Sequence, residues 1–290
     1  MKKFAAFLIS IMLVLSMVSV ASADTLSDIK EKGTLVVGAS VAFPPYEFYW
    51  TNPETGVEEP AGFDMSLAKG IADELGVELV IADQSFAGLI TALRAGEIDM
   101  IISGMAIRED RLEVVDFTMP YYTGAQIMLV RSEDFDTLKT VEDMTGKKVG
   151  AQLGGLQVGI LEEQFANAEP YVMEKVPLMI LDLLQGQLDG VLLADMVAKN
   201  YMVLNPGMLA ISEVPVDYNT SGGAGVAVAK GDNEALLEVL NAYIEKVTTD
   251  GTFDSWVDLA VEQNAKLVAE AEAAAAEATA APAETGTKTE

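Results

Sequence analysis

The sequence predicts an α/β protein with two units, each built from a parallel or mixed sheet with flanking helices. Strand and helix patterns alternate through about the first hundred residues, and this order indicates a parallel sheet. The same alternation starts again at Val141. Two segments, 125–131 and 222–226, lie where the chain would cross between the units, and we expect them to form a two-stranded hinge. A chain of 290 residues is long enough for two such lobes.

The first unit begins with a short amphipathic helix that Gly33 ends and a strand rich in β-branched residues. A longer helix has Asp64 as its expected N-cap and ends at Gly76. A polar turn within 49–60 indicates a hairpin. The predicted elements are helix 25–32, strand 34–38, helix 65–75, strand 77–81, helix 89–95, strand 98–102 and helix 108–115.

The second unit repeats this order and then returns toward the first. The region 116–122 is expected to be an irregular link, and a strand within 125–130 leaves the first unit. The remaining predicted elements are helix 141–145, strand 148–151, helix 158–165, strand 171–176, helix 178–184, strand 188–193, helix 196–204, strands within 210–216 and 221–229, and helices 234–247 and 251–259.

These elements predict the domain limits. Residues 24–128 and 222–260 would form one discontinuous lobe, and residues 129–221 the other. From residue 261 the composition shifts to Ala and Glu, so 261–290 is expected to be a low-complexity, partly helical tail without a binding role.

The composition excludes several kinds of chemistry. The chain has no Cys and no His, which rules out disulfides, a thiol nucleophile, a Cys/His zinc site and a Ser-His triad. A net charge of −27 argues against a nucleic-acid partner, because phosphates would be repelled. We therefore expect no cofactor, no metal ion and no nucleic acid.

The N-terminus has the three parts of an export signal. A basic start with Lys2 and Lys3 precedes an uncharged stretch, 4–20, and Ala21-Ser22-Ala23 is an A-x-A cleavage site. A permanent membrane anchor is the alternative, but the apolar run is short for a span. We expect residues 1–23 to be removed and the acidic product to be exported and soluble. Without a Cys at the cleavage point, it would not be lipid-anchored there.

Residues after the predicted strand 98–102 favour an anion. Ser103 and Gly104 are small and leave backbone N–H groups at a helix entrance, where anions bind. Arg111, one turn into the next helix, can reach back with a planar fork suited to a carboxylate. The alternative is a surface arginine paired with Glu109 or Glu113, an interaction usually worth little.

Other loops follow strand ends and would lie on the same rim, because ligands of open α/β sheets sit beyond the carboxyl ends of the strands. These are 40–43, which begins with Ser40, and 85–86. Two prolines after Phe43 prevent a helix and hold that side chain on a stiff loop, where we expect it to face a ligand. Tyr46 and Phe48 on the same loop could instead line the core.

The second unit has a possible counterpart at Gly154-Gly155, where a flexible backbone precedes a helix and could offer N–H groups to an anion. Glycines in such turns can also serve steric needs alone.

Several motifs together resemble the amino-acid-type extracellular solute-binding proteins that supply ABC importers. The resemblance covers about residues 25–260. It rests on VVG and FPPYEF within 36–48, GFD at 62–64, FAGLI to PYY over 86–122, GKKVGAQLG at 146–154, LDGVL at 188–192 and GVAVAKGD at 225–232. It implies the periplasmic-binding-protein fold with two lobes that close over a ligand, an ABC permease in the membrane as partner, a monomer, and binding without catalysis.

Carried over by position, the resemblance assigns the ligand's α-carboxylate to Arg111, with help from the N–H groups of Gly104 and Ala106. Phe43 and Phe86 would clasp the rest of the ligand. In the second lobe the resemblance implies three contact positions, Gln152, Leu156 and Gln157.

The chain departs from the family pattern where polar groups are usual. Ser40 replaces a frequent Asp, and Ala106 and Leu156 replace hydroxyl residues. The Asp that usually takes the ligand's ammonium aligns with Ala194, and Asp195 comes one residue late. Asp195, another carboxylate such as Glu47, or backbone carbonyls would then reach the amine, or the ligand is not an ordinary α-amino acid. With Phe43 and Phe86 as walls, the replacements at Ala106 and Leu156 favour a relatively apolar or uncharged amino acid.

Two other functions remain open from the sequence. Exported dehydratases that act on cyclohexadienyl acids resemble these proteins, and a carboxyl group such as that of Glu47 could serve as a general acid. A sensor that presents its closed lobes to a receptor would have the same sequence features.

Overall fold

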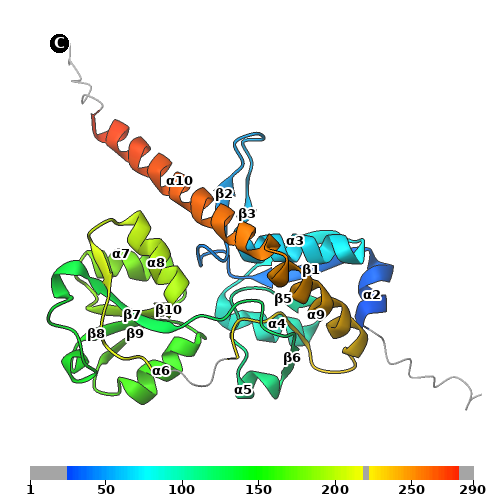
Figure 1. The fold of residues 1–290 in the computed structure, drawn as a ribbon, viewed down its shortest axis with the longest axis horizontal. Coiled ribbons are helices and arrows are strands. Elements are labelled where there is room, and N and C mark those ends of the chain that lie inside the picture. The colour runs from blue at the N-terminus through cyan, green and yellow to red at the C-terminus, as the bar shows by residue number, and fades with distance from the viewer. Residues whose placement is uncertain (1–24, 218–221, 281–290) are drawn as a thin grey trace, which may run out of the picture.

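The computed structural model describes residues 25–217 and 222–280. The predicted export signal, 1–23, lies outside these residues. Two five-stranded sheets form the cores of two units that lie side by side (Figure 1). The two-unit α/β prediction is therefore confirmed.

The first sheet has the strand order β4-β1-β5-β12-β6. β1 pairs in parallel with β4 and β5, whereas β12 is antiparallel to β5 and β6. The sheet consists of β1 (Thr34–Ala39), β4 (Glu78–Asp83), β5 (Met100–Ile101), β6 (Val115–Phe117) and β12 (Ala227–Ala229). The short strand β6 was missed, because the irregular link was expected to begin at Asp116.

Helices cover both faces of the first sheet. On β1, Leu35 and Val37 belong to the cluster with Phe63 of α3, and Val36 packs against the cluster that contains Leu89 of α4. Successive strand residues point to opposite faces, which explains this alternation. The helices here are α2 (Thr25–Lys32), α3 (Phe63–Leu75), α4 (Leu89–Ala95), α5 (Glu109–Leu112) and α9 (Glu234–Thr249).

The second sheet has the order β11-β7-β10-β8-β9, with β7 antiparallel to β10 and β11. Its strands are β7 (Gln126–Arg131), β8 (Lys148–Gln152), β9 (Glu169–Met173), β10 (Gly190–Ala194) and β11 (Leu209–Ile211). Its helices are α6 (Leu156–Gln164), α7 (Val176–Leu184) and α8 (Asp195–Leu204). We call the elements of the first sheet and its helices the first lobe, and those of the second sheet the second lobe.

Two segments connect the lobes and touch each other. The chain crosses first at 118–125, and the described residues of the return are 212–217 and 222–226. Tyr121 donates its N–H to the Ala224 carbonyl (2.8 Å), and Ala224 donates its own to Tyr122 (2.8 Å). A two-stranded hinge is thus present, but its first strand precedes the expected segment 125–131, because β7 pairs entirely within the second sheet.

Two peripheral elements complete the fold. The predicted hairpin is confirmed as β2 (Phe48–Thr51) and β3 (Glu58–Ala61). The last predicted helix, 251–259, is longer than expected: α10 (Thr252–Ala280) continues into the segment predicted to be a partly helical tail. Asn264 is only 3% exposed, and α10 contacts α3 and α9 of the first lobe and α8 of the second. In Figure 1 this helix extends from the first lobe past α8. Composition alone did not show that Asn264 is buried.

Candidate functional site

Two adjoining cavities lie between the lobes. They share five lining residues, so they are parts of one cleft: Phe43, Gly104, Ala106, Leu156 and Gln157. The first cavity is also lined by Tyr46, Tyr122, Gly124, Gln126, Ala194, Gly223 and Ala224. The second is also lined by Phe86, Ser103, Arg111, Gln152 and Gly155. The structure therefore brings nine of the eleven predicted site residues to this cleft.

Arg111 connects the two walls of the cleft. It lies on the short helix α5 and is only 5% exposed, so the alternative of a surface arginine is wrong. Its Nη1 donates to the Ala106 carbonyl (2.8 Å), and its Nη2 donates to the Gly154 carbonyl of the second lobe (3.0 Å). Its guanidinium carbon lies 5.6 Å from the centre of the Phe86 ring. The group is thus a buried, oriented cation in contact with both lobes.

The N–H of Gly104 has a partner inside the protein. It donates to Oδ2 of Asp64 at 2.7 Å, and the Tyr121 hydroxyl lies 3.2 Å from the same nitrogen. The sequence-based expectation left this N–H available for a ligand carboxylate. In the structure it is directed at a buried carboxylate, because Gly104 adopts a left-handed conformation (φ 56°) that the preceding strand did not reveal.

Asp64 is not the N-cap of α3, and that prediction is wrong. Gly62 occupies the N-cap position, and the Asp64 carboxylate accepts from Gly104 and from the Tyr121 hydroxyl (2.9 Å). Its Oδ1 is buried without a hydrogen-bond partner. The sequence signal for a buried Asp64 was its position, a charged residue among the apolar residues of α3. Burial raises the pKa of Asp64 to about 7, although the Gly104 and Tyr121 hydrogen bonds oppose that rise.

Glu47 lies behind the same wall. It is 1% exposed, and Oε1 accepts a hydrogen bond from the Ser103 hydroxyl (2.6 Å). That hydroxyl also accepts the N–H of Ser40 (3.0 Å). Burial and the nearby Asp64 charge raise the pKa of Glu47 well above its ordinary value. Glu47 does not line either cavity, so it is not placed to transfer a proton to a molecule in the cleft.

Amides from the second lobe face the cleft. Gln157 donates its Nε2 to Oε1 of Gln126 (2.9 Å), and Gln152 donates to the Glu174 carbonyl (3.2 Å). Both Gln152 and Gln157 are buried, as is the neighbouring Leu156. The second-lobe wall therefore offers neutral polar groups and one apolar side chain.

Ser40 and Asp195 are the predicted site residues that do not line the cavities. Ser40 lines a separate surface pocket, although its N–H bonds to Ser103. Asp195 begins α8, and its Oδ2 accepts from Lys199 (2.6 Å). Ala194, the last residue of β10, takes the lining position instead. The side chain of Ala194 thus lines the cleft, whereas that of the next residue, Asp195, pairs with Lys199 on the same helix.

The lining residues that were missed or assigned to the core include Tyr46, Tyr122 and Gln126. Tyr46 packs on Phe43 with ring centres 5.2 Å apart and makes an edge contact with Tyr122 at 5.9 Å. Burial, followed by the Asp195 charge and hydrogen bond, raises the pKa of Tyr122 to about 12. Tyr122 and Gln126 lie on the first crossing and at the start of β7, and their proximity to a hinge was the available signal.

The family follows from the sequence. The family model for bacterial extracellular solute-binding proteins, family 3, matches residues 35–258, which is more than half of the chain. The chain belongs to this family. Its fold is the two-lobed fold of periplasmic amino-acid-binding proteins, with two sheets joined by a two-stranded hinge.

Similar proteins are named as binding proteins for amino acids. The probable histidine-binding protein of Campylobacter jejuni is 32% identical over 77% of this chain and 83% of its own length. ABC transporter arginine-binding protein 1 of Escherichia coli is 31% identical over 76% and 88%. A Streptococcus pneumoniae amino acid ABC transporter substrate-binding protein, solved with L-arginine, has a TM-score of 0.77 and 34% identity, covering 82% of this chain and 98% of its own.

A further structural relative is connected to an enzyme. An ancestral amino-acid-binding protein, described as a precursor of cyclohexadienyl dehydratase, has a TM-score of 0.72 and 30% identity and covers 81% of this chain and 98% of its own. Within 25–217 and 222–280, no group of three or more acidic side chains is arranged to hold a metal ion. Over the same residues, no helix has the length and apolar character needed to cross a membrane.

Proposed function

We propose that this binding protein captures an amino acid or a close analogue between its two lobes and delivers it to an ABC importer. The observation that carries the proposal is Arg111, a buried cation whose donors reach both walls of the cleft. Such a fork suits a carboxylate, the group that all α-amino acids share. The names of the relatives, which include histidine-, arginine- and cystine-binding proteins, support the same class of ligand.

The mechanism is closure of the lobes around the ligand. A carboxylate at Arg111 would also lie near the second-lobe backbone at Gly155 and Leu156, which line the same cavity. A ligand that contacts both lobes binds the closed form more tightly than the open form, and this difference shifts the population toward closure. The permease would then distinguish the closed protein from the open one.

The remaining cleft residues would surround the ligand body. Phe43 and Phe86 form apolar walls, Ser103 and Ala106 lie beside the carboxylate position, and the three second-lobe residues Gln152, Leu156 and Gln157 close the opposite side. Gly104 would contribute through the close approach of its backbone, because its N–H already bonds to Asp64. Ser40 and Asp195 would act indirectly, behind the lining.

The cellular context follows from the same class of protein. We propose that the chain is exported after removal of 1–23, works as a monomer, and meets its permease at the membrane surface. Catalysis is not part of the proposal, because none of the described lining residues carries a carboxyl group and Glu47 is enclosed behind Ser103.

The test begins with identification by mass spectrometry of the small molecule that co-purifies with the protein. Calorimetry then compares Arg111→Ala with Arg108→Ala, a matched control whose guanidinium pairs with Asp110 outside the two cavities. We expect Arg111→Ala to weaken binding by at least about a hundredfold, because a buried partner of the ligand carboxylate is lost. The control should bind like the natural protein. Equal binding by both variants would contradict the proposed carboxylate contact.

A further inference from the structure

The last helix, α10, joins the two lobes by packing. Near its start Phe253 packs against Phe63 of α3 and Tyr121 of the hinge, with ring centres 5.5 and 6.0 Å apart. The same helix contacts α8 of the second lobe, beside which it passes in Figure 1. The hinge segments connect the lobes through the chain, whereas this contact connects them through side chains alone.

One face of α10 continues from the first lobe along the helix. Side chains that are buried or half-buried recur on this face at the spacing of helical turns: Phe253, Val257, Ala260, Asn264 and Leu267. Leu267 packs against an apolar cluster that contains both Phe63 of the first lobe and Tyr201 of α8. The face that fixes the start of α10 thus also packs further along the helix.

This later part of α10 lies outside the family pattern. The family match ends at residue 258, before Asn264 and Leu267. We call residues 261–270 the distal segment of α10. It is an addition of this chain to the part that the family model describes.

The packing of the distal segment includes an unpaired amide. Asn264 is 3% exposed, and its Nδ2 has no hydrogen-bond partner. On α8 the same holds for both amide atoms of Asn200. A buried polar group without a partner costs about 1 to 3 kcal/mol. Apolar side chains would therefore hold the distal segment more firmly than the present residues do.

The contact between α8 and α10 depends on the angle between the lobes. Phe253 fixes α10 to the first lobe, whereas α8 packs on β7, β10 and β11 of the second sheet. Rotation about the hinge moves α8 relative to α10, so this packing is either lost or replaced by a clash. Both outcomes favour the arrangement in which Arg111 meets the Gly154 carbonyl.

We infer that α10 is a brace between the lobes, whose distal segment stabilises the closed arrangement through α8 and thereby strengthens ligand binding. A ligand that requires the closed form binds more weakly when a smaller fraction of the protein can adopt that form. The inference rests on the lobe closure in the proposed function and is independent of the ligand's identity.

Two leucines on α10 provide a matched test. Leu267→Ala removes apolar volume from the inward face, and the control Leu259→Ala removes the same volume from a side chain that is 48% exposed. In calorimetry with the co-purified ligand, Leu267→Ala should bind at least about fivefold more weakly, and the control should bind like the natural protein. Equal affinities of the two variants would overturn the inference.

Asn264→Leu should have the opposite effect. Leucine is similar in size to asparagine and removes the unpaired amide, so the distal segment should pack more firmly in the closed arrangement. We expect this variant to bind the co-purified ligand at least about threefold more tightly. Unchanged or weaker binding would contradict the brace.

Distances between the lobes separate this inference from the proposed function. The chain has no Cys, so Glu97→Cys in the first lobe and Glu162→Cys in the second, both exposed, can carry spin labels. In double electron–electron resonance without ligand, Leu267→Ala should populate a different, more open distance than Leu259→Ala, and ligand should restore the closed one. Identical distances in the two variants, with closure by ligand in both, would overturn the brace alone. Distances that ligand leaves unchanged in every variant would overturn both the brace and the proposed closure.

Discussion

Two buried carboxyl groups, Glu47 and Asp64, organise the first-lobe wall of the cleft. They hold Ser103 and Gly104, whose positions shape the cavity beside Arg111. Each has one oxygen buried without a hydrogen-bond partner, and burial raises the pKa of both. An acid whose pKa is raised by folding is more stable protonated in the native state, so these groups make stability depend on pH.

The first prediction concerns this dependence. Folding raises the pKa of Asp64 from 3.8 to about 7 and also raises the pKa of Glu47. The two carboxyl groups therefore stabilise the folded state at a pH below their ordinary pKa values, and this stabilisation is lost as the pH rises through their pKa values in the folded protein. The free energy of unfolding should therefore fall between about pH 4 and 7. Glu47→Gln should make this fall shallower, by up to about 1.4 kcal/mol per pH unit for the one proton removed.

Urea denaturation at a series of pH values measures this slope. The exposed Glu97→Gln serves as the control, since it removes a carboxyl group from the surface. A slope unchanged in Glu47→Gln relative to Glu97→Gln would show that the buried pair does not control the pH dependence.

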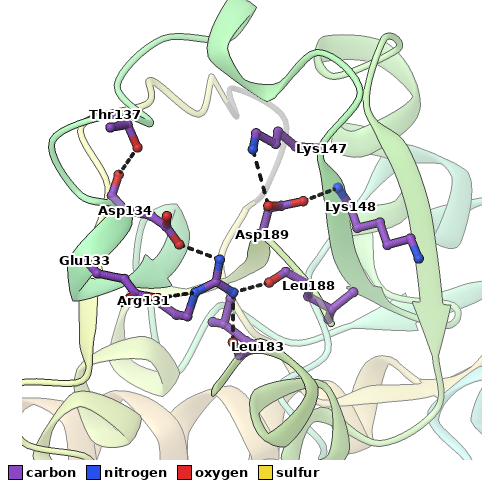
Figure 2. Close-up of polar contacts among 9 residues, drawn as sticks. All are labelled: Arg131, Glu133, Asp134, Thr137, Lys147, Lys148, Leu183, Leu188 and Asp189. Carbon is purple, nitrogen blue, oxygen red and sulfur yellow. Dashed lines mark hydrogen bonds and ion pairs between the residues drawn. The ribbon is translucent and has the colours of Figure 1, made fainter. Parts of the chain in front are cut away.

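At the scale of elements, Arg131 joins three parts of the second lobe. It ends β7, and its Nη1 donates to the Leu183 carbonyl at the end of α7 (3.0 Å) and to the Leu188 carbonyl before β10. Its Nη2 pairs with Asp134 at 2.5 Å (Figure 2). Asp189, in the same view, accepts the Lys148 N–H (2.8 Å). These contacts tie β7 and β8 to the residues just before β10, the strand that ends at Ala194.

Loss of Arg131 should weaken this lobe. Its side chain is only 15% exposed, so Arg131→Gln leaves carbonyls and a carboxylate without their partner. We expect the free energy of unfolding to fall by about 2 to 4 kcal/mol in urea denaturation. The exposed Arg94→Gln, the matched control, should change it by less than about 0.5 kcal/mol. Similar values for both variants would mean that Arg131 contributes only as a surface residue.

At the scale of the whole molecule, the structure is a closed arrangement of the lobes. The Arg111 contact with the Gly154 carbonyl crosses the cleft, and α10 of the first lobe contacts α8 of the second. Gly154 has φ 77°, and a Cβ placed there would lie 2.9 Å from Cα of Ala87 in the first lobe. The glycine therefore lets the two backbones approach, and a methyl group would keep them apart.

Gly154→Ala should thus impair closure. Its control is Gly146→Ala in the same lobe, which has a similar φ of 72° but no heavy atom within 4 Å of the added Cβ. Both variants should lose about 1 to 2 kcal/mol of stability from the left-handed backbone. Gly154→Ala alone should bind the co-purified ligand at least about tenfold more weakly, measured by calorimetry, and should remain more extended in small-angle X-ray scattering. Equal affinity of the two variants would contradict the role of this contact in closure.

The alternating patterns of apolar residues determined the order of strands and helices, and hence the two sheets and the crossing chain. These patterns depend on neighbours two to four positions apart, which the sequence displays directly. They also placed Arg111 at a strand end where an anion could bind. The family motifs extended this to both walls of the cleft, and nine of eleven named residues line it.

Only the tertiary structure decided which polar groups have partners. Gly104 meets Asp64 across 40 positions of sequence and Arg111 meets Gly154 across 43, and local patterns do not specify such pairs. The one-residue difference between Ala194 and Asp195 likewise depends on where β10 ends and α8 begins, which packing controls. For this reason the sequence alone indicated a carboxylate site, whereas the side chains packed around it determine whether a charged amine can accompany the carboxylate.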